Sequence, residues 1–216
     1  MTVIAIDGPA ASGKSSVARG LAAQLGYFYI NSGAMYRAVT WHVLRSGADP
    51  HSADSVAAAI NGADLRTGFE DRRSFIEIDG IRPYEQLRDE PVNRAVSAVS
   101  IVQAVRERLF AEFHKLAAQG DCVIEGRDIG SVVFPDTPYK FYLDANPEVR
   151  QGRRNAQGQR DEVAARDRID SSRHTAPLTI ARDAVVIDTS DLDLDEVIGA
   201  VQHALTVRGL PACDRA

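Results

Sequence analysis

The stretch GPAASGKSS, residues 8–16, combines residue types that bind phosphate groups. Gly8, four further residues and then Gly13-Lys14-Ser15 have the spacing of the phosphate-binding loop (P-loop) of nucleoside-triphosphate enzymes. Its glycines let backbone amides approach a polyphosphate, and the N-terminus of the following helix favours negative charge. The pattern predicts a nucleotide-binding loop made of Gly8, Pro9, Ala10, Ala11, Ser12, Gly13, Lys14, Ser15 and Ser16.

Two side chains of this loop have predicted roles in phosphoryl chemistry. Lys14 would reach the β- and γ-phosphates, and the Ser15 hydroxyl would ligate Mg²⁺. A GTPase would also carry an Asn-Lys-x-Asp stretch that reads the base, and the sequence contains none. An ABC-type ATPase would carry its own signature and a longer chain. The sequence therefore directs attention to a second site, which accepts a phosphoryl group.

Two clusters could form the acceptor site near strand ends. Phosphoryl transfer between two anions needs cations at the transferring group and a site closed to water. In NSGAMYR, residues 31–37, Ser32 and Arg37 can hold an anion, and Tyr36 offers a flat face. In EGRDIGSVVFPD, Arg127 and Asp128 follow a buried strand, where parallel α/β sheets bind ligands. These two residues are placed for a phosphate and for a metal-bound water or a substrate base.

A third cluster lies in an arginine-rich segment. Residues 147–174 contain many arginines and few large apolar side chains. Within RDRIDSSR, Arg166, Asp170 and Arg173 recur at spacings of four and three, so on a helix they share one face. Such a segment fits a lid whose arginines close over the transferring phosphoryl group.

Length, charge and composition limit the class of protein. The chain has 216 residues, 44% of them apolar, and a formal net charge of −5. This length fits one compact α/β domain with small insertions, and a mildly acidic chain is not expected to bind nucleic acid or membranes non-specifically. The two cysteines have neither disulfide nor metal spacing, and no signal peptide or apolar run of ~20 residues is present. We expect a cytoplasmic protein.

The first elements must position the P-loop. Residues 3–7, VIAID, are a continuous apolar run typical of a buried parallel strand. A helix is predicted from Lys14 to about Leu25, ended by Gly26, followed by a strand at 27–30. Ser32 is then expected to cap a helix that runs to about Arg45. This order is typical of a parallel sheet.

The later elements change character and then return to the core pattern. An Ala-rich helix is predicted within 48–62 and two short strands within 63–79, which indicates an inserted subdomain over 48–95. A helix is predicted from Val102 to Gln119. CVIEG, YKFYLDA and AVVIDTS predict three more core strands, and a final helix is expected at 193–207.

Taken together and in this order, GPAASGKS, SGAMYR, EGRDIGSVVFPD and RDRIDSSRHTAPL resemble the bacterial cytidylate (CMP) kinases, a nucleoside-monophosphate kinase family. The resemblance covers nearly the whole chain, and EGRDIG followed by VVFPD is its most specific part. It implies a P-loop α/β/α fold of three layers with a mainly five-stranded parallel sheet. The implied divisions are a core at 1–30, 101–148 and 175–216, a monophosphate-binding subdomain with a small β element at 31–100, and a short arginine-rich lid at 149–174.

The resemblance also implies an activity and residue roles. The family transfers the γ-phosphoryl group of ATP to CMP or dCMP with Mg²⁺. The implied CMP-phosphate contacts are Ser32, Arg37, Arg127 and Arg173. The implied cytosine contacts are Ser97 and Arg106, with Asp128 nearby. The implied sugar contacts are Arg166 and Asp170. Arg150 and Arg154 lie at the start of the lid and would contact the transferring group. The implied catalytic set is Lys14, Arg127, Arg154, Arg166 and Arg173.

The sequence departs from the family pattern at three places. Asn31 stands where the family usually has aspartate, so an ion pair made there is lost. The segment NAQGQRDEVAA between Arg154 and Arg166 is shorter than the usual lid, which suggests the hypothesis that water reaches the site and hydrolyses ATP. GIRPYEQLR replaces a Gly-acid-Val-Ser/Thr stretch on the insert surface, where little effect on chemistry is expected.

Two other functions remain open from the sequence. One is a P-loop kinase of another small acceptor, such as shikimate or a different nucleoside monophosphate, which would have no use for Ser97, Arg106 and Asp128 together. The other is a nucleotide-gated binding protein without efficient catalysis, supported only by the short lid. In the leading interpretation the partners are CMP and dCMP, with no nucleic acid and no membrane, and the protein is a monomer.

Overall fold

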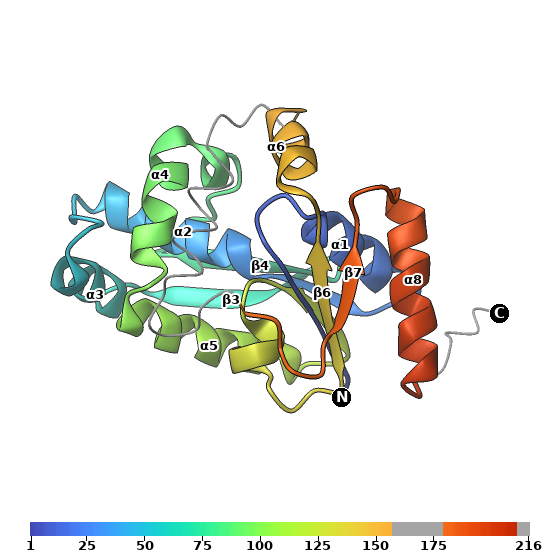
Figure 1. Ribbon diagram of the computed structural model, residues 1–216. Helices are drawn as coiled ribbons and strands as arrows, with labels where there is room; N and C mark the ends of the chain where they lie inside the picture. The colour runs from blue at the N-terminus through green and yellow to red at the C-terminus, as the bar shows by residue number, and fades with distance from the viewer. Residues whose placement is uncertain (157–178, 211–216) are drawn as a thin grey trace. The chain divides into compact units, whose positions relative to one another are not determined.

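The chain divides into two compact units in the computed structural model, which describes residues 1–156 and 179–210 (Figure 1). The P-loop unit comprises residues 1–30 and 120–216, and the inserted unit comprises residues 31–119. The predicted lid residues Arg166, Asp170 and Arg173 lie outside the described residues.

A mostly parallel sheet forms the centre of the P-loop unit. Its strands follow one another in the order β2 (Phe28–Asn31), β5 (Cys122–Glu125), β1 (Val3–Asp7), β6 (Tyr139–Asp144) and β7 (Val185–Asp188). Strand β1 pairs in parallel with both β5 and β6, and all five of its residues are buried. A strand with both faces covered reads as an unbroken apolar run, which is why VIAID predicted it.

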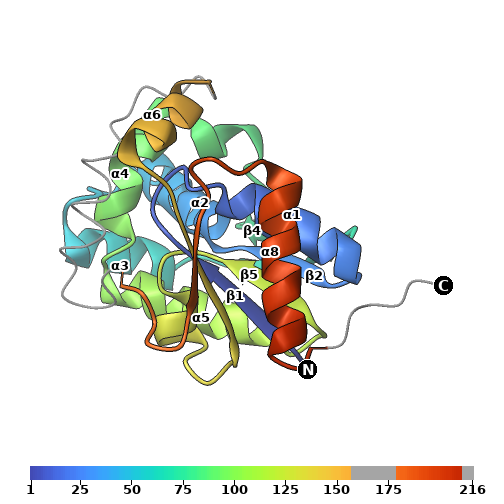
Figure 2. The same cartoon turned by 45° about the vertical axis from the view of Figure 1, so that its right-hand side comes forward.

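Two long helices cover this sheet. Helix α1 (Lys14–Leu25) and helix α8 (Leu194–Val207) pack side by side, as Figure 2 shows. Leu21 of α1 and Val201 of α8 belong to one core cluster with Ile4 and Ile6 of β1. Shorter elements complete the unit: a π-helical turn η2 (Ile129–Val133) after β5, and helix α6 (Pro147–Ala156) after β6.

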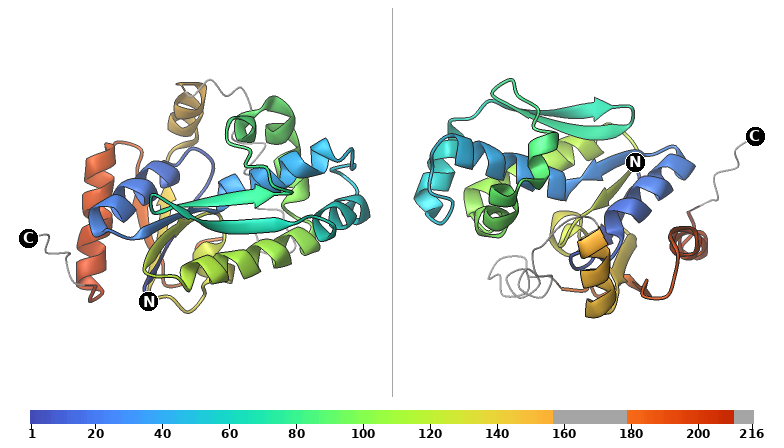
Figure 3. Two further views of the ribbon diagram at one scale, coloured as in Figure 1. Left: turned by 180° about the vertical axis from the view of Figure 1, so that it is seen from behind. Right: turned by 90° about the horizontal axis from the view of Figure 1, so that it is seen from above.

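The inserted unit is mainly helical around one hairpin. Its elements are α2 (Ser32–Arg45), α3 (Ala53–Asn61), β3 (Leu65–Glu70), β4 (Arg73–Ile78), the 3₁₀-helix η1 (Glu85–Arg88), α4 (Glu90–Val99) and α5 (Gln103–Ala117). Strands β3 and β4 pair antiparallel, and the hairpin lies along α5 (Figure 3). The Thr67 hydroxyl on β3 donates to Glu112 Oε2 on α5 at 2.5 Å, which fixes the two elements to each other.

Most predicted elements are confirmed, and the α/β class with a mostly parallel sheet is confirmed as well. The cap of α2 is a correction: Asn31, not Ser32, caps this helix, because its side chain accepts the Ala34 amide while Ser32 is already helical. Helix α4 was not predicted as a separate element. The helix predicted over 102–119 is α5, which belongs to the inserted unit.

No helix within residues 1–156 and 179–210 is long and apolar enough to cross a membrane.

Candidate active site

The P-loop connects the end of β1 to the start of α1. Gly8 has a φ of 148°, and a Cβ atom there would lie 2.1 Å from the Leu143 carbonyl oxygen. Gly13, directly before α1, has a φ of 91°. Both positions therefore require glycine, the first because of the neighbouring backbone and both because of the left-handed conformation.

Lys14 is buried, and its side chain lies against the loop itself. Its Nζ donates to the Pro9 carbonyl oxygen at 2.5 Å and to the Ser12 hydroxyl at 3.4 Å. Only 5% of the residue is exposed. The ammonium group is thus held among the loop's own oxygens, where a bound polyphosphate would supply competing anionic ligands.

The Ser15 hydroxyl has a carboxylate partner that the sequence reasoning did not single out. Ser15 Oγ donates to Glu125 Oε1 at 2.6 Å, and the Tyr29 hydroxyl reaches the same oxygen at 3.3 Å. Glu125 ends β5 and is 4% exposed. The available signal was its position: a carboxylate at the carboxyl end of a core strand that pairs with β1.

The Ser15–Glu125 pair fits a magnesium ion. Mg²⁺ prefers oxygen ligands and is usually held by one or two protein groups together with substrate phosphates. A serine hydroxyl and a buried carboxylate in contact with each other supply such oxygens at the P-loop. When bound, the ion would neutralise part of the negative charge on the transferring phosphoryl group.

Arg127 and Asp128, both predicted site residues, lie directly beyond β5 and beside the P-loop. Arg127 Nη1 donates to the Gly8 carbonyl oxygen at 3.1 Å. Asp128 is 4% exposed, and its carbonyl oxygen accepts the Val132 amide at 2.9 Å, which begins the turn η2. The loop after β5 is therefore joined to the residue that opens the P-loop.

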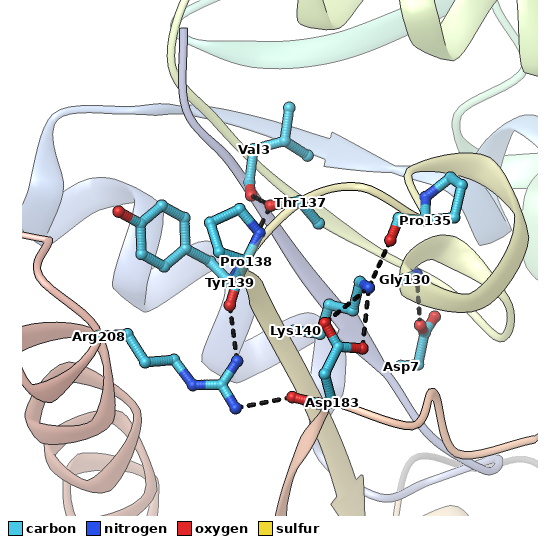
Figure 4. Close-up of polar contacts among 10 residues, drawn as sticks. All are labelled: Val3, Asp7, Gly130, Pro135, Thr137, Pro138, Tyr139, Lys140, Asp183 and Arg208. Atoms are coloured by element: carbon cyan, nitrogen blue, oxygen red, sulfur yellow. Dashed lines mark hydrogen bonds and ion pairs between the residues drawn. The ribbon is translucent and has the colours of Figure 1, made fainter.

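Asp7 is a second site residue that the sequence reasoning missed. Its Oδ1 accepts the Ile129 amide at 2.8 Å and its Oδ2 accepts the Gly130 amide at 2.7 Å; the Gly130 contact is drawn in Figure 4. Burial raises the pKa of this carboxyl group to about 7, against the two amide hydrogen bonds, which lower it. The charge of Asp128 raises the pKa further, and that of Lys14 lowers it.

Arginines of helix α6 connect this helix to the P-loop. Arg150 donates from Nε to the Ala145 carbonyl oxygen at 2.9 Å and from Nη1 to the Ala10 carbonyl oxygen at 3.3 Å. Arg153, which was not predicted, donates to the hydroxyl and carbonyl oxygens of Thr189 at 3.0 and 2.5 Å.

Thr189 continues this connection, because its hydroxyl donates to the Ser12 carbonyl oxygen at 3.1 Å. Arg154, the other predicted lid residue in this helix, is 9% exposed. Helix α6 is therefore attached to two carbonyl groups of the P-loop, directly at Ala10 and through Thr189 at Ser12.

The inserted unit carries the predicted acceptor-side residues of α2, α4 and α5. Ser32 is buried in the first turn of α2, and Tyr36 follows one turn later. Arg37 Nη2 donates to Asn93 Oδ1 at 3.3 Å. This contact ties α2 to α4, the helix that also contains Ser97.

Arg106, a predicted base contact, is buried against an aromatic ring. It is 3% exposed, its guanidinium carbon lies 4.8 Å from the centre of the Phe110 ring, and Nη1 reaches the Ser100 carbonyl oxygen at 3.5 Å. The Ser100 hydroxyl in turn donates to the Ser97 carbonyl oxygen at 3.1 Å. Ser97 and Arg106 are thus linked through one residue within the inserted unit.

The chain is similar to known proteins over most of its length. A family model described as cytidylate kinase matches residues 4–206. The chain belongs to the cytidylate kinase family. The cytidylate kinase of Rhodococcus opacus (strain B4) is 46% identical over 218 residues, covering 95% of this chain and 95% of that protein. The cytidylate kinase of Mycobacterium leprae (strain Br4923) is 44% identical, covering 95% of this chain and 96% of that protein.

As a member of the cytidylate kinase family, the protein is an enzyme and a kinase. A crystal structure of an uncharacterized protein from Eubacterium ventriosum ATCC 27560 has a TM-score of 0.53 to this chain at 16% identity. That match covers 95% of this chain and 98% of the other, and it shows a shared fold.

Proposed function

We propose that the protein transfers the γ-phosphoryl group of Mg-ATP to CMP or dCMP, producing ADP and CDP or dCDP, within pyrimidine nucleotide metabolism. The observation that carries the proposal is the contact of Arg127 with the Gly8 carbonyl oxygen. This contact places an arginine suited to an acceptor phosphate beside the P-loop, within one unit of the structure. The chain that carries both belongs to the cytidylate kinase family.

On the donor side, we assign the ATP phosphates to the loop amides of residues 8–16 and to Lys14. Lys14 would exchange the Pro9 carbonyl oxygen for phosphate oxygens, which are stronger, anionic acceptors. Ser15, with Glu125, would hold Mg²⁺. Arg150, already bonded to the P-loop at Ala10, would add positive charge at the nucleotide.

On the acceptor side, an anionic oxygen of the CMP phosphate attacks the γ-phosphorus, and the bond from that phosphorus to the bridging oxygen of ADP breaks. No general base is required, because the attacking oxygen carries no proton. The proposal assigns the acceptor phosphate to Ser32, Arg37, Arg127 and Arg173, with Tyr36 beside it. It assigns the sugar to Arg166 and Asp170, and the transition-state charge to Arg154 as well.

Specificity for cytosine is assigned to Ser97, Arg106 and Asp128. Arginine donors suit the cytosine O2 and N3 acceptors, and a carboxylate suits the N4 amino group, so uracil or a purine would leave buried groups unpaired. The burial of Arg106 against Phe110 supports this assignment, because a fixed guanidinium discriminates better than a mobile one.

The test is an ADP-release assay with Mg-ATP against CMP, dCMP, UMP, AMP, GMP and no acceptor. We expect turnover with CMP and dCMP, slow turnover with UMP and none with the others. ADP release that does not depend on an acceptor would contradict the proposal. It would support the hypothesis that the short lid lets water reach the site and hydrolyse ATP.

Base recognition is tested separately with Arg106→Met, which keeps the length of the side chain and removes its donors. We expect the KM for CMP to rise by about tenfold or more and the KM for ATP to change less than about threefold. Arg108→Met, an exposed neighbour on the same helix, is the matched control and should leave both constants unchanged. A parallel rise of both KM values would contradict the assignment.

We further propose that the enzyme is a cytoplasmic monomer with a core, a monophosphate-binding subdomain and a lid, the subdomain extending to residue 119. Light scattering coupled to size-exclusion chromatography tests the oligomeric state, and a mass near the 23.4 kDa of one chain is expected.

A further inference from the structure

We propose that Asp7 is a positioning residue that holds the loop carrying Arg127 and Asp128 against the P-loop, and thereby sets the affinity for the acceptor nucleotide. The inference rests on the proposed function, because it assumes that Arg127 and Asp128 contact CMP. Asp7 itself is not placed in contact with any substrate.

Both oxygens of the Asp7 carboxylate are used by one short segment. Oδ1 accepts the Ile129 amide at 2.8 Å, and Oδ2 accepts the Gly130 amide at 2.7 Å (Figure 4). Within the turn η2 the first amide donated to Asp128 is that of Val132, so Asp7 satisfies amides that precede the turn's own ladder. A carboxylate is the one short side chain that can accept from both amides at once.

The next residue of the chain makes a second connection to the same loop. The Gly8 carbonyl oxygen accepts from Arg127 Nη1 at 3.1 Å. Gly8 therefore binds residue 127 on one side of Asp128, and Asp7 binds residues 129 and 130 on the other side. Asp128 is held between these contacts, so its position depends on the end of β1.

The loop also has little space in which to shift. A Cβ atom on Gly130 would lie 3.0 Å from Lys140 Cγ and 3.4 Å from the Ala5 Cβ atom. The glycine thus allows the backbone of η2 to pack closely on β1 and β6. With the backbone in place on one side, the two Asp7 hydrogen bonds fix its direction on the other.

The charge of the site agrees with a positioning role rather than with an ion pair. Asp7 is 4% exposed and its hydrogen bonds go to neutral amides. Its charged neighbours are Lys14, which lowers its pKa, and Asp128, which raises it. Burying a carboxyl group here costs stability, and the geometry indicates what the protein gains: a fixed acceptor loop.

The decisive variant is Asp7→Asn, which keeps the shape of the side chain. Asparagine offers one acceptor oxygen and an NH₂ group, so one of the two amides would face a donor. We expect the KM for CMP, and the Kd for CMP measured by calorimetry without ATP, to rise by about tenfold. The KM for ATP should change by less than about threefold.

The matched control is Thr137→Val. Thr137 Oγ1 donates to the Val3 carbonyl oxygen at 2.5 Å (Figure 4). It therefore ties the segment between β5 and β6 to the other end of β1. We expect this variant to melt at a lower temperature and to keep the KM for CMP of the unmodified enzyme. Loss of CMP affinity in both variants would overturn the proposal in favour of a general structural role.

A second variant covers the case in which Asp7→Asn does not fold. Gly130→Ala would press on Lys140 Cγ and displace the Gly130 amide from Asp7, and we expect a smaller rise in the KM for CMP. An unchanged KM for CMP in the folded variants overturns the inference while the proposed function stands. If the unmodified enzyme neither binds nor phosphorylates CMP, the proposed function fails, and this inference fails with it for that distinct reason.

Discussion

The two ends of the connection between β5 and β6 are anchored by opposite means. At the first end, the Asp7 carboxylate is buried, accepts two backbone amides and has a raised pKa. At the second, Lys140 donates to both oxygens of Asp183 at 2.9 Å and to the Pro135 carbonyl oxygen at 2.5 Å (Figure 4). The Lys140 hydrogen bond lowers the pKa of Asp183.

The difference separates geometry from stability. Asp183 is half exposed and has a cation as its partner, and Arg208 reinforces the region by donating to the Pro138 and Asp183 carbonyl oxygens at 2.6 and 2.7 Å. This end stabilises the fold at neutral pH. The Asp7 end is costly at neutral pH and lies beside the P-loop, as expected where function sets the arrangement.

Lys14→Met is expected to give the largest effect. It should remove activity on the side of the molecule where Asp7 and the P-loop lie, without unfolding the protein. Removing the P-loop cation should lower kcat by about 100- to 1,000-fold, because the charge on the transferring phosphoryl group is no longer neutralised. Melting temperature should change little, since methionine fills the same space. Steady-state kinetics at saturating Mg-ATP and CMP test this, and a variant with near-normal kcat would remove Lys14 from the mechanism.

The pH dependence of stability should distinguish the two ends next. The folded-state pKa of Asp7, about 7, lies above the unfolded value of 3.8, so its contribution is fully present below pH 3.8. It is lost as the pH rises through 7. Relative to Asp7→Asn, the unmodified protein should therefore lose about 2 kcal/mol of unfolding free energy between pH 5 and 7.

Urea unfolding of both proteins across this pH range measures that difference. A difference between the two proteins that stays constant with pH would mean that Asp7 titrates in the folded state as it does in the unfolded chain.

Lys140→Met should give the smallest effect and alter only the second end. It removes the ion pair and leaves the Pro135 carbonyl oxygen without this donor, but keeps the side-chain stem that packs beside Gly130. Because Asp183 is half exposed, we expect a loss of only about 1–2 kcal/mol in unfolding free energy. The KM for CMP should be unchanged, and a rise in it would show that this end also positions the acceptor loop.

The local features of the fold were predictable because their causes are local. The apolar run VIAID, the P-loop glycines and the end of α1 at Gly26 depend on neighbours in the chain, and each is found as expected. The cap of α2 was misplaced by one residue, since Asn31 and Ser32 are both good capping residues and the backbone chooses between them.

The sequence alone determined the P-loop, most of the strands and helices in their order, and the candidate residues in recognisable motifs, because short-range spacing carries that information. It did not reveal helix α4 or helix α6. Only the tertiary structure decided the partners of these residues. Glu125 meets Ser15 across 110 positions of sequence, Asp7 meets Gly130 across 123, and Arg153 meets Thr189 across 36. A hydrogen bond requires two groups within about 3 Å of each other. The packing of the sheet brings these groups together, and no periodicity or spacing along the chain encodes it.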